Sequence, residues 1–123
     1  MTDNVNHPAH YEANGPFECI ELTEQYDFCL GNAIKYVWRH MDKGHPVEDL
    51  SKALWYIQRE IDSIGGDYFP APMGTIRKLL TLSATDYAHM ADFWYAIYEG
   101  SLIDAKQEIQ TRINQLTENE DTQ

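Results

Sequence analysis

The sequence predicts an all-α protein, a small helical bundle with an extended N-terminal arm. In several segments apolar residues recur every three or four positions, which is the spacing of one face of an α-helix. Clusters of Gly, Pro, Asn and Asp separate those segments, and no segment has a convincing strand pattern. We expect two parts: an arm with three helices over residues 1–64, and a helical extension over residues 65–123.

The first part begins with an arm and two short helices. Residues 1–16 are polar and contain two prolines, which favours an extended segment. A short helix is expected over about residues 16–28. Asn32 suits the N-cap of a second helix that runs to about Met41. Gly and Pro then interrupt the pattern, and Pro46 suits the first turn of the next helix.

The helix that begins near Pro46 has the clearest periodicity. One apolar stripe recurs at spacings of 4, 3, 4 and 3, and it is formed by Leu50, Leu54, Ile57, Ile61 and Ile64. Trp55 points away from that stripe, and so large an apolar side chain favours a second contact. We expect that contact with the C-terminal region or with another subunit.

The second part begins with a linker. Residues 65–74 contain three Gly and two Pro, a composition typical of a loop. Helices are then expected near residues 75–82, 85–99 and 101–116. We expect this extension to pack on the first part or to lie in an oligomer interface.

The bulk composition limits the classes of function. The chain has 123 residues, a net charge of −11 and a pI of about 4.6. This charge argues against binding of duplex nucleic acid, because a phosphate backbone requires a basic face. No apolar run approaches the ~20 residues of a membrane span, and no signal peptide is evident. We therefore expect a cytoplasmic protein without a membrane partner. The high aromatic content favours a second buried surface, such as a partner interface.

Basic residues gather in one segment of this acidic chain. Residues 31–61 hold five of the nine, namely Lys35, Arg39, Lys43, Lys52 and Arg59. Lys35 and Arg39 are four residues apart and share a helix face, with Tyr36 beside them. Cations that bind phosphate and a ring that stacks on a base suit a nucleotide. The alternative is a solvated basic face that pairs with acidic neighbours.

The next helix supplies further candidates. Asp49 and Tyr56 flank its apolar stripe. Asp49 is placed to orient Lys35 or Arg39 across the helix pair, to hold a metal, or to form an ordinary salt bridge. Glu48 and Lys52 are four residues apart, which is typical of a surface pair.

The arm and the first helix carry weaker candidates. His7, His10 and Tyr11 on the arm suit contact with a base or a phosphate, while a zinc site lacks a clear third ligand. Docking of the arm on the core is the alternative. Glu18 and Glu21 resemble the carboxylates that hold magnesium in all-α pyrophosphohydrolases, although acids are also favoured at helix N-termini. The sequence contains no P-loop motif.

The order of these motifs resembles a family of small phage proteins. The blocks are NHPAHY, ECIE, FCLGNAIKYVWR and EDLSKALWYI, over about residues 6–61. This SaV-like family includes the C-terminal part of the phage T7 kinase that acts on thymidylate and guanylate. The resemblance implies an oligomeric, nucleotide-handling protein of the host cytoplasm. The chain lacks the Cys-rich N-terminal region of the T7 protein and carries residues 67–123, which have no counterpart in the resemblance.

The first hypothesis is therefore a P-loop-free deoxynucleoside monophosphate kinase, with a nucleoside triphosphate donor and Mg²⁺. The catalytic candidates are Lys35, Arg39 and Asp49. The nucleotide-binding candidates are His7, His10, Tyr11, Asn32, Tyr36, Lys43, Lys52 and Tyr56. Glu18 and Glu21 are candidates for a metal.

Three alternatives remain open from the sequence. The first is an oligomer that sequesters a nucleotide without turnover. The second is an all-α pyrophosphohydrolase, which needs about four converging carboxylates; the available ones are Glu18, Glu21, Asp49 and Glu60. The third is an acidic inhibitor of a host protein.

Overall fold

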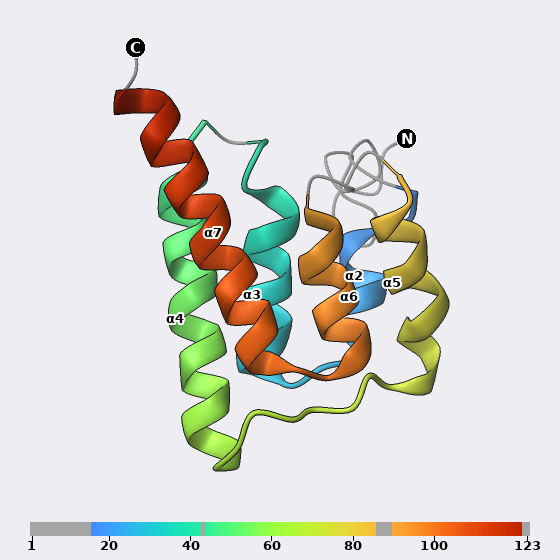
Figure 1. Cartoon of the computed structure of the whole chain (residues 1–123). Coiled ribbons are helices and arrows are strands. Elements are labelled where there is room, and N and C mark those ends of the chain that lie inside the picture. The colour runs from blue at the N-terminus through green and yellow to red at the C-terminus, as the bar shows by residue number, and fades with distance from the viewer. Residues whose placement is uncertain (1–15, 43, 86–89, 122–123) are drawn as a thin grey trace, which may run out of the picture.

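The structure is a computed structural model that describes residues 16–42, 44–85 and 90–121. These residues form six α-helices and one short 3-10 helix, and they contain no strand beyond an isolated bridge between Tyr68 and Ser101 (Figure 1). The all-α prediction is confirmed for this part of the chain. The predicted arm lies outside the described residues.

The helices follow the chain in order from the N-terminal side. They are α2 (Cys19–Thr23), α3 (Phe28–Arg39), α4 (Pro46–Ile64), the 3-10 helix η1 (Met73–Thr75), α5 (Ile76–Ser83), α6 (Ala91–Glu99) and α7 (Leu102–Asp121). Within the described ranges, no helix combines the length and the apolar character needed to cross a membrane.

The start of α3 differs from the prediction. Asp27, not Asn32, is the N-cap: its backbone is extended and its Oδ1 accepts a hydrogen bond from the N–H of Leu30 at 3.0 Å. Asn32 lies inside the helix, where its Nδ2 donates to the carbonyl of Phe28 at 2.8 Å. The helix predicted over residues 16–28 is therefore replaced by the short α2, a turn and the first residue of α3.

The ends of α4 agree closely with its sequence signals. Pro46 occupies the first turn, and Gly65 ends the helix with a positive φ of 72°. Leu50 and Ile57 of the predicted stripe are buried, whereas Ile64 at its end is 41% exposed. Trp55 is 61% exposed, so it does point away from the stripe.

The C-terminal helices are close to their predicted positions. α5 is shifted by one residue from its predicted range, and α7 continues five residues beyond the predicted end. α6 starts at Ala91 with Met90 as its N-cap, later than the predicted start at residue 85, and residues 86–89 lie outside the described part of the chain. Gly100 makes the sharp turn into α7 with φ of 82°, and a Cβ there would lie 2.8 Å from the carbonyl oxygen of Phe69. Only glycine fits that turn without strain.

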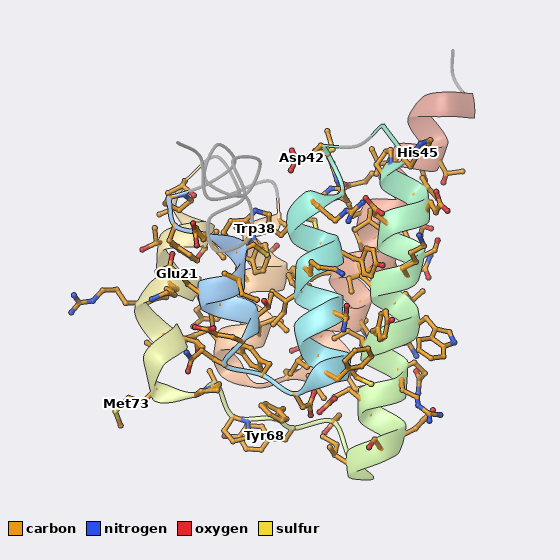
Figure 2. The ribbon with its side chains drawn as sticks, turned by 180° about the vertical axis from the view of Figure 1, so that it is seen from behind. Glu21, Trp38, Asp42, His45, Tyr68 and Met73 are labelled. Carbon is orange, nitrogen blue, oxygen red and sulfur yellow. The ribbon has the colours of Figure 1, made fainter. Side chains whose placement is uncertain are left out.

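One core joins the helices on both sides of the linker. α3 packs along α4, α4 along α7, and α6 against both α5 and α7. Trp94, Phe93, Leu102 and Ile109 from the C-terminal helices share this core with Ile34, Leu50 and other residues of α3 and α4. Figure 2, seen from the side opposite to Figure 1, shows α3 and α4 side by side in front of α7. On that side no described helix covers the α3–α4 pair.

Candidate functional site

Helical periodicity places nine residues on the outward side of the α3–α4 pair. We call this surface the α3–α4 face. On α4, Lys52, Trp55, Tyr56 and Arg59 follow spacings of 3, 1 and 3, so they share one face of the helix. The neighbouring helix contributes Phe28, Asn32, Lys35, Tyr36 and Arg39.

Three cations surround one ring at the middle of this face. The Nζ of Lys35 lies 4.6 Å from the centroid of the Tyr36 ring, the Nζ of Lys52 5.5 Å and the Cζ of Arg39 5.6 Å. All three distances are within the ~6 Å range of a cation–π interaction. Lys35, Arg39 and the Tyr36 ring belong to α3, and Lys52 belongs to α4. We call this group the cation centre.

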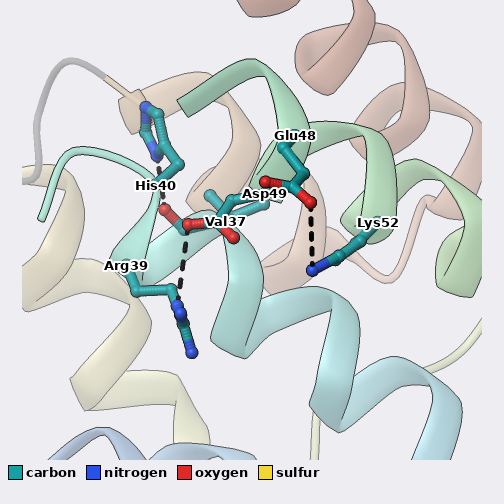
Figure 3. Close-up of polar contacts among 6 residues, drawn as sticks. All are labelled: Val37, Arg39, His40, Glu48, Asp49 and Lys52. Carbon is teal, nitrogen blue, oxygen red and sulfur yellow. Dashed lines mark hydrogen bonds and ion pairs between the residues drawn. The ribbon is translucent and has the colours of Figure 1, made fainter. Parts of the chain in front are cut away.

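Two of the three cations also face a carboxylate (Figure 3). The Nε of Arg39 lies 3.6 Å from Oδ2 of Asp49, which is an ion pair but too long for a hydrogen bond. The Nζ of Lys52 lies 3.7 Å from Oε1 of Glu48 on the surface. Lys35 has no carboxylate partner in an ion pair among the described residues. Within residues 16–42, 44–85 and 90–121, the two ion pairs thus leave the charge of Lys35 without a paired carboxylate.

Asp49 forms its ion pair with Arg39 from the buried side of the face. Its side chain is 5% exposed, while that of Arg39 is 37% exposed. Arg39 thus places its Nε against a buried carboxylate and leaves part of its guanidinium open to a ligand. A buried carboxylate opposite an arginine restricts the arginine's orientation. Asp49 is suited to positioning Arg39, and it does not itself lie in the open.

An aromatic cluster adjoins the cation centre. The rings of Tyr36 and Tyr56 are nearly parallel, with centroids 6.0 Å apart and an angle of 12°. Phe28 and Trp55 meet Tyr56 edge-on, at 5.9 Å and 5.1 Å. Phe28 is 73% exposed and Trp55 61%. Contiguous exposed aromatic surface of this kind marks an interaction site.

A shallow pocket of about 250 Å³ lies beside the cation centre, between α2 and α3. Thr23, Asp27, Phe28, Asn32 and Lys35 are among the residues that line it. Lys35 belongs to both features, since it lines the pocket and lies over Tyr36. The structure thus places Asn32 and Lys35, two of the predicted site residues, in the lining of one pocket.

A carboxyl pair lies beneath one end of the face. Glu60 of α4 is only 2% exposed, and its carboxyl group meets Asp27, the N-cap of α3. Burial, the hydrogen bond to Asp27 and the negative charge of Asp27 raise the pKa of Glu60 to about 7, against a smaller lowering by the backbone of Leu30. One of its oxygens has no hydrogen-bond partner among the described residues. Near neutral pH this group is thus partly protonated.

The carboxylates that a pyrophosphohydrolase needs do not converge. Glu18 and Glu21 form a capping box at the start of α2, in which Oε2 of Glu21 accepts from the N–H of Glu18 at 2.7 Å. Asp49 faces Arg39, and Glu60 faces Asp27. The described ranges contain no group of three or more His, Cys, Asp or Glu side chains that could hold a metal ion.

Some predicted site residues lie outside the described part of the chain, and some residues of the α3–α4 face were not predicted as site residues. His7, His10, Tyr11 and Lys43 lie outside the described residues. Phe28 and Trp55, which the structure places on the α3–α4 face, were not among the predicted site residues. The sequence did indicate the position of Trp55. Helical spacing alone places it on the same side of α4 as Lys52, Tyr56 and Arg59.

Comparison with known proteins gives one match. The model of a family described as a protein of unknown function, DUF3310, matches residues 5–58. None of the curated proteins compared with the chain matches it. None of the solved structures matches it either. The matched segment contains the whole cation centre and the four aromatic residues next to it, and it ends before Arg59, α5, α6 and α7.

Proposed function

We propose that the protein binds a nucleotide on the α3–α4 face, with the phosphate groups at the cation centre. The observation that carries the proposal is the convergence of Lys35, Arg39 and Lys52 from two helices around Tyr36. A local cluster of cations in an acidic chain attracts small anions, whatever the net charge of the molecule. The exposed rings of Phe28 and Trp55 offer the base a stacking surface within reach of the phosphates.

The activity that we propose for this site is phosphoryl transfer onto a deoxynucleoside monophosphate, as the resemblance to the SaV-like family implies. In that reaction the bond from the terminal phosphorus of the donor to its bridging oxygen breaks. A new bond forms from that phosphorus to a phosphate oxygen of the monophosphate. The step needs mainly positioning and neutralisation of charge, and no covalent nucleophile. Lys35, Arg39 and Lys52 would neutralise the phosphates, and Asp49 would position Arg39.

The test begins with binding. Calorimetry with a panel of deoxynucleoside monophosphates and triphosphates measures affinity for the full chain and its variants. We expect Lys35→Ala and Arg39→Ala each to weaken binding about tenfold or more, since a hydrogen bond to a charged group contributes about 1.5–3 kcal/mol. The thermal midpoint of Lys35→Ala should change little, because that side chain is partly exposed. Arg39→Ala should also lower the midpoint, because it leaves the buried carboxylate of Asp49 without its partner charge.

Lys78→Ala is the matched control. Lys78 is also a half-buried lysine over an aromatic ring, with its Nζ 5.6 Å from the centroid of Phe17, but it has no cation beside it at that ring among the described residues. Equal losses in Lys35→Ala and Lys78→Ala, or no binding by the wild type, would contradict the proposal.

The second measurement separates a kinase from a sequestering protein. The purified chain is mixed with a monophosphate, a range of triphosphates and Mg²⁺, and the products are separated by anion-exchange chromatography. Formation of diphosphate that disappears in Lys35→Ala supports phosphoryl transfer. Tight binding with unchanged nucleotides supports the alternative, a non-catalytic nucleotide-binding protein.

The resemblance also leads us to propose a homo-oligomer in the host cytoplasm. Light scattering coupled to size-exclusion chromatography gives the mass of the assembly directly. A mass of one chain, 14.2 kDa, at micromolar concentration would contradict this proposal. The same measurement with nucleotide added shows whether binding and assembly are coupled.

A further inference from the structure

The α3–α4 face carries a further cation, Arg59, beyond the cation centre. The cation centre lies toward one end of the helix pair, and Arg59 lies seven residues from Lys52 along α4. At 1.5 Å per residue the two Cα atoms are about 10 Å apart. Arg59 is exposed, and it has no ion-pair partner among the described residues. A second anion-binding group is therefore present on the same side of α4.

Arg59 lies near the first turn of α3. Burial and the charges of Glu60 and Asp27 raise the pKa of Cys29, and the guanidinium of Arg59 partly opposes them. The residue next to Cys29 is Phe28, the most exposed ring of the aromatic cluster, at 73%. The order along the face is thus cation centre, aromatic cluster, Arg59.

The aromatic cluster between the two cationic positions has two well-exposed rings. Phe28 and Trp55 both contact Tyr56 in T-shaped geometry, and they are 73% and 61% exposed. Each base of a strand that is not paired can stack on such a ring. Bases in a duplex are covered by their neighbours, and a net charge of −11 opposes approach of a duplex.

We infer that the α3–α4 face binds a short single-stranded oligonucleotide, with one phosphate at the cation centre, another at Arg59 and bases stacked on Trp55 and Phe28 between them. The inference rests on the proposed function, because the first phosphate binds at the cation centre. It goes beyond that function because the ligand is a strand of several nucleotides and not a single nucleotide. Successive phosphates of one B-DNA strand are about 3.4 Å apart along the helix axis. Because this axial rise is smaller than the full distance between phosphates, a distance of about 10 Å spans at most about three nucleotides.

The experiment measures affinity against strand length. Fluorescence anisotropy of the full chain is recorded with 5′-labelled oligothymidylates of one to eight nucleotides, and with the matching oligouridylates to separate DNA from RNA. We expect affinity to rise with length up to about three nucleotides, by roughly fivefold or more per stacked base, and then to level off. An affinity that does not depend on length overturns the inference.

Variants locate the strand on the face. Trp55→Ala and Phe28→Ala should weaken binding of the hexanucleotide by about fivefold or more. Arg59→Ala should weaken it and reduce the slope of log affinity against log salt by about 0.7, the value for one phosphate contact on a single strand. The controls are Arg77→Ala, an exposed arginine of α5, and Tyr68→Ala, a ring 64% exposed in the linker. Equal effects in variants and controls contradict the inference.

Trp55 also reports on stacking directly. It is the only exposed tryptophan of the three, because Trp38 and Trp94 are 5% and 0% exposed. Saturating hexanucleotide should quench the intrinsic fluorescence of the wild type and leave that of Trp55→Phe nearly unchanged. Inorganic polyphosphate of the same length should compete poorly. If polyphosphate competes as strongly as unlabelled oligonucleotide, the face recognises only charge. That result overturns the inference that bases stack on Trp55 and Phe28.

Failure of the inference differs from failure of the proposed function. The first case is that mononucleotides bind, that Lys35→Ala abolishes this binding and that strand length has no effect on affinity. In that case only the single-strand inference is wrong. If neither mononucleotides nor oligonucleotides bind, both are wrong. If Trp55→Ala changes the mass of the assembly and not the affinity for the strand, the face is an interface between copies, and the inference is again wrong.

Discussion

Helix α3 contributes to two aromatic clusters, which differ in their burial and in the charged groups around them. The inner cluster consists of Trp38, Phe93 and Trp94, whose rings pack edge-on at 6.4 Å and 4.9 Å. The outer cluster consists of Phe28, Tyr36, Trp55 and Tyr56. Trp38 and Tyr36 are two residues apart in sequence, yet one is 5% exposed and the other is ringed by three cations.

The difference shows which forces act in each region. The inner rings are buried among aliphatic residues and contribute mainly by the removal of apolar area from water. The outer rings remain partly in solvent, and charged groups surround them. Substitutions in the inner cluster should therefore reduce the free energy of unfolding. Those in the outer cluster should reduce ligand affinity.

The largest expected effect is in the inner cluster. Trp94→Ala should lower the free energy of unfolding by about 3–5 kcal/mol, because it removes a fully buried ring and leaves a cavity. Trp94→Phe is the control. It keeps most of the ring and removes an indole N–H that has no hydrogen-bond partner in the described part of the chain, so it should cost much less. Urea denaturation measures both, and equal losses would contradict this reading.

The second effect concerns Glu60, which is buried beneath the outer cluster. Its pKa is about 7 in the folded chain against an ordinary value of 4.5, so the folded state binds the proton more tightly than the unfolded state. Stability should then fall as pH rises from 4.5 to 7, by about 3 kcal/mol in total. Glu60→Gln cannot ionise and should flatten this part of the profile. Parallel profiles for wild type and variant would refute the assignment to Glu60.

A third prediction tests the positioning role of Asp49. Asp49→Asn removes the charge opposite Arg39 and should weaken nucleotide binding about fivefold, within the range of a charged interaction. If Asp49 acts through Arg39, the same substitution should have little further effect in the Arg39→Ala background. A double-mutant cycle on nucleotide affinity measures this. Additive losses would mean that Asp49 acts independently of Arg39.

The smallest effect is expected at the exposed pair of Lys52 and Glu48. Glu48→Gln should change the free energy of unfolding by less than about 0.5 kcal/mol, because both side chains are half-exposed or more. It also removes a negative charge that competes with phosphate for Lys52. Calorimetry should therefore show an affinity that is unchanged or up to about threefold higher. A weaker affinity would show that Glu48 contributes to the site.

Much of the fold could be predicted because helical periodicity is a local property. The stripe of α4, its start at Pro46 and its end before Gly65 needed no knowledge of the rest of the chain. The start of α3 was wrong because Asp27 and Asn32 are both good N-cap residues. Packing decides between them: a Cβ at Gly31 would lie 3.0 Å from the carbonyl oxygen of Thr23, so this part of the helix fits closely against α2.

The site could be predicted only within each helix. The spacing of Lys35, Tyr36 and Arg39 showed that they share a surface. Lys52 was also a predicted nucleotide-binding residue. Which side of α4 meets the α3 surface is a tertiary property, so its position over the Tyr36 ring required the structure. Asp27 at the start of α3 and Glu60 near the end of α4 are distant along the chain, so no local pattern indicates their pairing.

The central claim is that phosphate groups bind at the cation centre. The most direct measurement is a titration of ¹⁵N-labelled full chain with a deoxynucleoside monophosphate, followed by amide chemical shifts in NMR spectra. We predict saturable shifts confined to residues 28–39 of α3 and 48–59 of α4, and their loss in Lys35→Ala. Shifts centred on α6 or α7, or no saturable shift at millimolar nucleotide, would contradict the account.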